Sequence, residues 1–452
     1  MDLANRISEI CLAKFDQLPK TGKPKEGFEW TIFAAIVKVE QYAGEQKVEV
    51  VALGTGTKCL GGHELSMKGD VLNDSHAEVM ARRGFLRYMM HEMKCCLSER
   101  SNVFEYEKEP KKFRLKSDVS FHFFTTHTPC GDASIYEQAD KSAQSDPPSP
   151  ATKKIKLTCD SSDVGSAIVE RAEGMTGGKL LECSGIDLMA QDTGMIRTKP
   201  GKGERTLSVS CSDKMARWNI LGVQGSLVIS LLVQPIYLES IVICDGTDYN
   251  KEAMERALWE RWEPALKQDL LKESYRLHKP SICVATNGRF FRFRKNSKYD
   301  GSNKFQPAPG GIVWCAGVEE RPLEVEIGGR RQGVTKKKLG TAAARLKISK
   351  IELFSTFISL RNALRLGDTG DEPSSADEKM SLSLQGSEGS STATVTREIL
   401  SSSGNSSSSS LRYADAKKLC RAYREQWNIL RDKVFRVWSE KPSSLLDFRL
   451  ES

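Results

Sequence analysis

The 452-residue sequence has few of the features that mark secreted or membrane proteins. Its 12 cysteines follow no repeating spacing, which excludes the disulfide framework of a small secreted domain. The first residues, MDLANRISEI, lack the basic segment and apolar run of a secretory signal. The most apolar stretch, 218–238, contains Asn, Gln, Ser and Pro, so we expect a buried helix there and not a membrane span of about 20 apolar residues. These absences indicate an intracellular protein with reduced thiols, in the nucleus, the cytoplasm or both.

Positive charge is in modest excess. The chain has 67 Lys and Arg against 59 Asp and Glu, a formal net charge of +8. A surplus of cations suits an anionic partner such as nucleic acid, although many basic proteins bind none. Apolar residues make up 39% of the chain, which is sufficient for a sizeable core.

Two segments differ in composition from the rest. Residues 139–178 and 367–410 are rich in Ser, Asp, Pro and Gly and show no hydrophobic period. Such compositions bury too little apolar surface to offset the entropy of ordering. We therefore expect two flexible insertions within one domain that spans residues 1–452. The basic run PATKKIK at 150–156 is either a nuclear signal or a plain linker.

Strand and helix patterns alternate along the remaining chain. Apolar spacing predicts helices at 3–15, 74–93, 213–233, 251–266 and 413–439. Val, Ile and aromatic residues predict strands at 30–39, 48–53, 119–126, 207–210 and 237–244. We therefore expect an α/β fold, a sheet covered by helices, with a C-terminal helical extension.

Three places share one pattern, in which a strand ends, a metal-binding side chain follows and a helix begins. They are LNDSHAEVMARRGF with His76 and Glu78, FHFFTTHTPCGDAS with Cys130, and TLSVSCSDKMARWN with Cys211. Strand ends gather ligand sites, and a helix N-terminus favours a thiolate. One His and two Cys leave a fourth tetrahedral position open for water, as in catalytic zinc sites. We predict Zn²⁺ on His76, Cys130 and Cys211, with Glu78 carrying protons.

Each of these residues has a simpler interpretation when taken alone. Ser75 and Glu78 fit a capping box, in which they only satisfy helix-end amides. Cys130 and Cys211 fit ordinary buried thiols, and His127 is a rival ligand that we interpret as a turn residue. The metal site is favoured by the coincidence of His-x-Glu, Pro-Cys and a further Cys, each at a helix start.

The set resembles the zinc-dependent nucleobase deaminases, whose signature is His-x-Glu followed by Pro-Cys-x-x-Cys. Here Gly-Asp-Ala follows Cys130, so the third ligand must come from elsewhere. The blocks NDSHAE at 73–78, PCGD at 129–132 and SCSDKMARWN at 210–219 are similar to the adenosine deaminases acting on RNA. This resemblance extends from the GTGTKC loop at 54–59 to the tail at 438–442. It implies a cytidine-deaminase-like mixed sheet with helices on both faces.

Within that family, editors of double-stranded RNA carry RNA-binding domains ahead of the deaminase. Here the deaminase pattern begins close to Met1, and the chain looks like the tRNA-specific branch, which converts the adenosine 3′ of the anticodon of alanine tRNA to inosine. The resemblance implies tRNA as partner and hydrolysis by a zinc-activated water, with Glu78 as proton shuttle. The alternatives are a double-stranded-RNA editing enzyme and a catalytically inactive RNA-binding scaffold that keeps the metal for folding. The intact Glu78 argues against the scaffold.

A second set of basic residues lies on helices that otherwise look buried. Ion pairing, for example of Glu78 with Arg82, is the simpler interpretation. The family instead buries inositol hexakisphosphate. The resemblance implies that its ligands are Arg82, Arg83, Lys214, Arg217, Lys350 and Lys417, supported by Trp218, Tyr413, Tyr423 and Lys441. Trp427 stands where the family has one further lysine.

Three segments are candidates for RNA contacts. Thr57 and Lys58 match a substrate-contacting position of the family. The stretch IRTKPGKGERT contributes Arg197, Lys199, Lys202 and Arg205. In RFFRFRK at 289–295 we favour a half-buried strand, with Phe291 and Phe293 inward, over an RNA contact. The run KKK at 336–338 is interpreted as a solvated turn.

Overall fold

A computed structural model describes residues 2–136, 175–180, 190–201, 206–266, 269–295, 305–366 and 411–450. The predicted insertion at 367–410 lies outside the described residues, and so does 139–178 except for its last four positions. The basic run at 150–156, Lys202 and Arg205 also lie outside them. Thr176, in the described end of the first segment, is buried.

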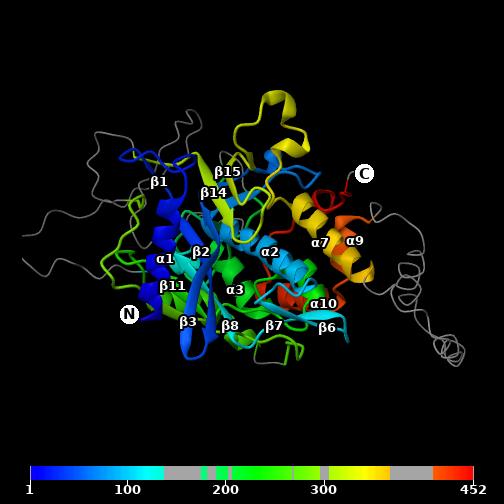
Figure 1. The fold of residues 1–452 in the computed structure, drawn as a ribbon. Helices are drawn as coiled ribbons and strands as arrows, with labels where there is room; N and C mark the ends of the chain where they lie inside the picture. Colours follow the sequence, from blue (N-terminus) through cyan, green and yellow to red (C-terminus); the bar gives the residue numbers. More distant parts are fainter. Residues whose placement is uncertain are drawn as a thin grey trace, which may run out of the picture.

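An eight-stranded mixed sheet forms the centre of the molecule (Figure 1), in the order β12-β11-β8-β2-β3-β14-β15-β16. The strands are β2 Phe33–Tyr42, β3 Glu45–Thr55, β8 Val119–Thr125, β11 Ser240–Ile243, β12 Ser281–Val284, β14 Gly310–Cys315, β15 Leu323–Ile327 and β16 Arg330–Arg331. Strands β8, β11 and β12 run parallel to one another, and the other neighbours are antiparallel. The predicted mixed sheet is confirmed.

Smaller strand pairs surround the main sheet. They are β1 Glu29–Trp30 with β13 Gln306–Pro307, β4 Thr57–Cys59 with β5 Asp74–His76, β6 Phe104–Glu107 with β7 Lys112–Leu115, and β9 Lys179–Leu180 with β10 Arg197–Thr198. Short 3-10 turns are η1 Gly62–Glu64, η2 Asp132–Ser134, η5 Lys336–Lys338, η6 Ala342–Ala344 and η9 Ser443–Leu445.

Helices cover both faces of the sheet because its central strands are apolar on both sides. Along β2, Ala34 and Ile36 belong to one core cluster, whereas Ala35 and Val37 belong to another. Successive strand residues point to opposite faces. Helix α1 (Leu3–Gln17) packs in the second cluster and α2 (Ala77–Cys96) in the first. Helices on both faces were therefore predicted correctly.

Three of the predicted helices are broken in the structure. The expected helix at 213–233 divides into α3 (Cys211–Leu221), α4 (Gly225–Val228) and η3 (Ile229–Leu231). Gly222 and Gly225 have φ of +81° and +74°, which ends a right-handed helix. The segment 251–266 divides into α5 (Lys251–Glu255), a π-helical turn η4 (Arg256–Glu260) and α6 (Glu263–Leu266).

The C-terminal part is helical, as predicted, but not one helix. It consists of α9 (Tyr413–Lys418), α10 (Arg421–Leu430) and the π-helical turn η8 (Arg431–Phe435). Helix α7 (Lys350–Leu366), which was not predicted from the sequence, packs against α2, and Figure 1 shows α9 beside it. Within the described ranges, no helix has the length and apolarity needed to cross a bilayer.

Two further predictions need correction. The stretch 207–210 is not a strand, since Val209 makes only an isolated bridge with Thr198. The helix predicted from residue 74 begins at Ala77, because residues 74–76 form strand β5 against β4. His76 is thus the last residue of a strand and the N-cap of α2.

Candidate active site

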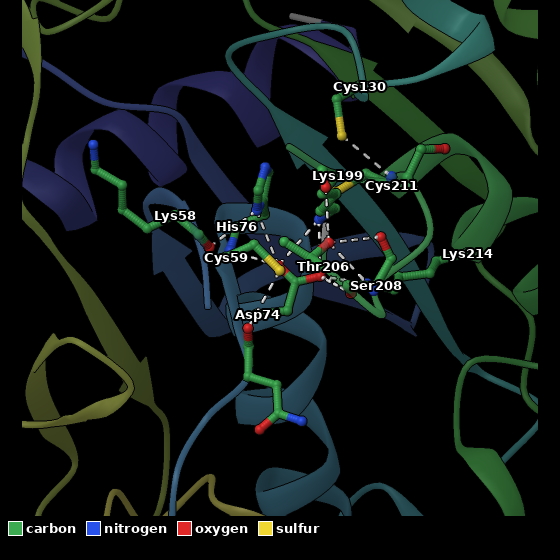
Figure 2. A network of polar contacts seen from close by, with 12 residues as sticks. Lys58, Cys59, Asp74, His76, Cys130, Lys199, Thr206, Ser208, Cys211 and Lys214 are labelled. Carbon is green, nitrogen blue, oxygen red and sulfur yellow. Dashed lines mark hydrogen bonds and ion pairs between the residues drawn. The ribbon is translucent and has the colours of Figure 1, made fainter. Parts of the chain in front are cut away.

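The three predicted metal ligands converge from three different elements. His76 ends β5, Cys130 lies between β8 and η2, and Cys211 begins α3. The Cys211 amide donates a hydrogen bond to Cys130 Sγ at 3.3 Å, and the His76 ring is in hydrogen-bonding contact with the same thiol. The fold therefore brings the predicted set together (Figure 2).

Gly131 allows the turn that carries Cys130 and the turn that carries Cys211, here called the two cysteine turns, to pack closely together. The Ser212 amide donates to the Cys130 carbonyl at 3.1 Å. Gly131 has φ +105°, and a Cβ there would lie 2.2 Å from Ser210 Oγ and 2.5 Å from Ser212 Oγ. Only glycine fits this close approach, so the Gly after Cys130 has a local structural cause.

Asp74 fixes the orientation of the His76 ring. Nδ1 of His76 lies 2.9 Å from Asp74 Oδ1 and 3.2 Å from the Lys58 carbonyl. Because Nδ1 is engaged by these acceptors, Nε2 is the nitrogen available to a ligand. A carboxylate behind a histidine in this way sets its tautomer and raises its basicity.

Glu78 is buried without a full set of partners. Its side chain is 1% exposed, and Oε2 has no hydrogen-bond partner among the described residues. Burial, and then the negative charge on Cys130, raise the pKa of the Glu78 carboxyl. A buried polar atom without a partner costs about 1–3 kcal/mol, which points to a group that is bound there in the working protein.

Both simpler interpretations of Glu78 are wrong. The N-cap of α2 is His76, with no side-chain hydrogen bond at the cap, so Ser75 and Glu78 form no capping box. Among the described residues Glu78 Oε2 has no partner, and Arg82 instead donates through Nε to the Val223 carbonyl at 2.7 Å. The rival ligand His127 is an exposed bend residue, as predicted.

Lys199 joins the site to Asp74 and was misassigned from the sequence. It is 1% exposed, and its Nζ donates to Cys211 Sγ at 2.9 Å and to Asp74 Oδ1 at 3.1 Å (Figure 2). Burial works to lower the pKa of the Lys199 ammonium, but Asp74 and Cys211 raise it well above its ordinary value. Arg197 is also fully buried, donating to two backbone carbonyls. Neither cation is available to RNA, so these two predicted contacts are wrong.

The donor set suits a tetrahedral metal with one open position, although the side chains are engaged with one another. Among the described residues, no group of three or more His, Cys, Asp or Glu side chains forms a metal site as it stands. Contact with Cys211 lowers the pKa of the Cys130 thiol well below its ordinary value in spite of burial. A thiolate, a second thiol facing Lys199 and an oriented imidazole are ligands that zinc prefers.

Cations from the four helices α2, α3, α7 and α9 face one another beside this site. Arg82 lies 5.3 Å from the Trp218 ring, Arg217 donates to Tyr423 Oη at 3.0 Å, and Lys417 lies 5.6 Å from the Tyr413 ring. Arg83 donates to the Ile348 carbonyl at 2.6 Å, Lys350 to the Leu445 carbonyl at 3.4 Å, and Lys214 to Asp74. The ten residues predicted for the polyanion thus gather in one place, including Lys441, which interacts with Lys214 and Lys350.

The basic cluster, defined as Arg82, Arg83, Lys214, Arg217, Lys350, Lys417 and Lys441, carries more positive charge than its surroundings neutralise. Burial, and then Lys441, Arg83 and Lys417, lower the pKa of Lys350 to about 7. Burial and neighbouring cations likewise lower the pKa of Lys417 to about 8 and that of Lys441 to about 8. Asp74 is the carboxylate that faces these groups, and it already accepts from Lys199 and Lys214. A bound anion would offset this repulsion and favour the charged form of the lysines.

The remaining RNA candidates lie at the surface or in the core. Thr57 and Lys58 pair with His76 and Ser75 across β4 and β5, which places them beside the site. Phe291 and Phe293 are buried, as predicted, but the stretch 289–295 is a loop and not a strand. Residues 336–338 form the exposed turn η5, in agreement with the predicted solvated turn.

Comparison with known proteins is consistent with this geometry. The adenosine-deaminase (editase) domain family matches residues 52–442. The chain is 37% identical to tRNA-specific adenosine deaminase 1 of Drosophila melanogaster, over 98% of this chain and 96% of that protein. It is 31% identical to the mouse protein of the same name, over 99% of each. Double-stranded RNA-specific editase Adar of Drosophila melanogaster is 29% identical, over 78% of this chain and 52% of its own length. The chain belongs to the adenosine-deaminase (editase) family.

Proposed function

We propose that the chain is a zinc-dependent, tRNA-specific adenosine deaminase that hydrolyses adenosine to inosine 3′ of the anticodon of alanine tRNA. The observation that carries the proposal is the buried Glu78 carboxylate, with an unpartnered oxygen, beside His76, Cys130 and Cys211. Full-length similarity to two proteins named tRNA-specific adenosine deaminase 1 supports tRNA over duplex RNA, since the duplex editase matches only part of each chain.

Zinc would be held by Nε2 of His76 and by the thiolates of Cys130 and Cys211. When bound, it lowers the pKa of a water ligand and so supplies a nucleophile at neutral pH. Asp74 holds the His76 ring, and Lys199 stabilises a thiolate on Cys211. These contacts place two charged groups behind the ligands.

Glu78 would move the protons of the reaction. As the water oxygen bonds to C6 of adenine, Glu78 would pass one water proton to N1 and the other to the exocyclic nitrogen. The C6–N6 bond then breaks and that nitrogen leaves as ammonia. The raised pKa of Glu78 suits this cycle, because a carboxyl that titrates closer to neutral pH both accepts and returns a proton. An inactive scaffold would have no use for such a group.

The basic cluster supports inositol hexakisphosphate as a second, structural ligand. Its members come from α2, α3, α7, α9 and the C-terminal tail, so a compact polyanion would hold these segments together. Trp427, at the position of a family lysine, lies 3.7 Å from the Arg217 guanidinium, which replaces a charge with a cation–π contact. Denatured, purified protein should release about one inositol hexakisphosphate per chain, measured by mass spectrometry. Active protein that releases none would refute this ligand.

Thr57 and Lys58 would contact the RNA substrate beside the reacting base. Their strand β4 lies directly against His76, and Lys58 is exposed. Lys58→Ala should therefore raise KM for RNA, with a smaller change in kcat.

The substrate is tested by incubating the protein with alanine tRNA and with perfect duplex RNA, and then assaying inosine at each adenosine. We expect inosine in the tRNA, next to the anticodon, and little in the duplex. Inosine spread along the duplex would indicate a double-stranded-RNA editor. Binding of RNA without inosine in either substrate would indicate a scaffold.

A further inference from the structure

The two cysteine turns repeat one local pattern, a cysteine followed two residues later by an aspartate. Cys130-Gly-Asp132 begins η2, and Cys211-Ser-Asp213 begins α3. Both aspartates are fully buried, at 0% exposure. A buried carboxylate needs compensating charge or hydrogen bonds, so the partners of this pair identify what holds the turns.

One arginine contacts both carboxylates. Arg261, which follows η4, places NH1 3.8 Å from Asp132 Oδ2 and donates through NH2 to Asp213 Oδ1. NH1 also donates to the Met195 carbonyl at 3.2 Å, and Nε to the Ala257 carbonyl at 3.2 Å. The Arg261 side chain is 7% exposed. Arg261 thus spans the two turns from the side of α5 and η4.

Further partners saturate each carboxylate. Asp132 accepts from the Gly194 amide at 2.6 Å and from Arg256 Nε at 3.2 Å. Asp213 accepts from Ser210 Oγ at 2.6 Å and from the Arg197 amide at 3.1 Å. Arg256 reaches Asp132 alone, which leaves Arg261 as the one side chain that these contacts show joining both aspartates.

Contacts that involve the backbone also join the same two turns. The Cys211 and Ser212 amides donate to Cys130 Sγ and to the Cys130 carbonyl, and Gly131 packs against Ser210. The turns are therefore fastened once through backbone and once through the arginine. Two separate points of attachment fix the distance and the angle between the thiols, which one point cannot do.

We propose that Arg261 is a positioning residue that sets the relative placement of Cys130 and Cys211 before the metal binds. The proposal rests on the proposed zinc site and assigns to that site an arginine clamp, defined as Arg261 with Asp132 and Asp213. Arginine is required because its planar fork presents separate N–H groups to two acids, whereas lysine offers a point charge. Loss of a group that hydrogen-bonds to a metal ligand commonly lowers metal affinity about 10- to 100-fold, and we expect a loss of this order when the two turns that carry the cysteines are no longer joined.

The clamp is tested with the conservative variant Arg261→Lys in the full chain. Zinc affinity, measured by competition with a chromophoric chelator, should fall about 10- to 100-fold. Arg87→Lys is the matched control, because Arg87 is a buried arginine that donates to the carbonyls of Glu320 and Arg321, far along the chain from the cysteine turns. It should bind zinc within about twofold of the unaltered protein, by the additivity expected of independent sites.

A double-mutant cycle separates the clamp from general destabilisation. Asp213→Asn should weaken zinc binding in the unaltered protein and should weaken it less in the Arg261→Lys background, because the contact between Arg261 and Asp213 is already changed there. Unchanged zinc affinity in Arg261→Lys would overturn the proposal. An equal loss in Arg87→Lys, or full additivity with Asp213→Asn, would overturn it too.

A second measurement does not depend on the metal. In chelator-treated protein, alkylation of Cys130 and Cys211 by iodoacetamide, followed by mass spectrometry, should be faster in Arg261→Lys than in Arg87→Lys. Equal rates would contradict the clamp. Faster alkylation in a protein that binds no zinc would contradict the proposed function while leaving the clamp in place.

Discussion

Lys199 and Cys211 illustrate how single residues set the chemistry of the candidate site. The ammonium and the sulfur lie 2.9 Å apart in a region closed to solvent. In such surroundings an unpaired charge is costly. Burial, and then Cys130, raise the pKa of the Cys211 thiol well above its ordinary value, and Lys199 opposes this shift. Asp74, on the far side of Lys199, has its pKa held well below the ordinary value by Lys199 and Lys214 against the opposing effect of burial. Behind the ligands, the Asp74 carboxylate thus lies between two ammonium groups, those of Lys199 and Lys214.

At the residue scale we predict that Cys211→Ala abolishes zinc binding, because one thiolate and the histidine leave too few ligands. Metal analysis should fall from about one zinc per chain to near zero. Cys315→Ala is the matched control, since Cys315 is equally buried but lies in β14, and it should retain the metal. Loss of zinc in the control alone would show that the wrong thiol has been assigned.

The sequence identifies some site residues because their pattern is local. His76, Glu78, Cys130 and Cys211 each stand in a short motif where a strand gives way to a helix. Lys199 could not be assigned in this way, since its partner Asp74 is 125 positions away. The basic stretch that contains Lys199 is equally typical of an RNA-binding loop. Only the packing around β10 shows that Arg197 and Lys199 are buried.

At the element scale, the close contact of the two cysteine turns depends on a glycine. Gly131→Ala forces an unfavourable φ and also drives a Cβ to 2.2 Å from Ser210 Oγ. Gly194 has φ +79° but open space around the position of a Cβ, so Gly194→Ala isolates the backbone cost of about 1–2 kcal/mol. We predict that Gly131→Ala lowers the free energy of unfolding by clearly more than Gly194→Ala in urea titrations. Equal losses would show that the turns do not interlock as described.

Element boundaries were harder to predict than the elements. Apolar spacing continues through residues 213–233, yet the helix ends at Gly222, whose amide donates to the Trp218 carbonyl. The helix after Asp74 starts three residues late because β4 recruits residues 74–76 into a strand pair. Both outcomes depend on tertiary contacts that a periodicity does not contain. The opposing apolar faces of β2, in contrast, follow from its continuous apolar run.

At the scale of the whole molecule, the basic cluster couples stability to a bound anion. Lys350, Lys417 and Lys441 have pKa values of about 7, 8 and 8 in the ligand-free fold, below the value near 10.4 of an unfolded lysine. Between about pH 7 and 9 the unfolded chain therefore binds more protons than the folded chain, so the free energy of unfolding increases with pH. At and below pH 7 these lysines are protonated in the folded chain, where their charge is unfavourable. The ligand-free fold is therefore least stable there.

We predict that the free energy of unfolding of ligand-free protein increases from pH 7 to pH 9, and that this dependence is lost when inositol hexakisphosphate is bound, because the anion favours charged lysines. Urea unfolding across this range measures both slopes. In ligand-free protein, Lys350→Met should reduce the increase of the free energy of unfolding with pH. Lys68→Met, at an exposed position, should leave this increase unchanged. Identical slopes with and without the ligand would contradict the polyanion site.

The central claim is that Glu78 carries protons at a metal held by His76, Cys130 and Cys211. It is tested most directly by measuring zinc content and inosine formation on alanine tRNA in the same samples of unaltered and Glu78→Ala protein. We predict about one zinc per chain in both, with inosine formation lowered by about 10²- to 10⁴-fold or more in the variant, the usual contribution of general acid–base catalysis. Substantial deamination by a zinc-loaded Glu78→Ala protein would contradict the account.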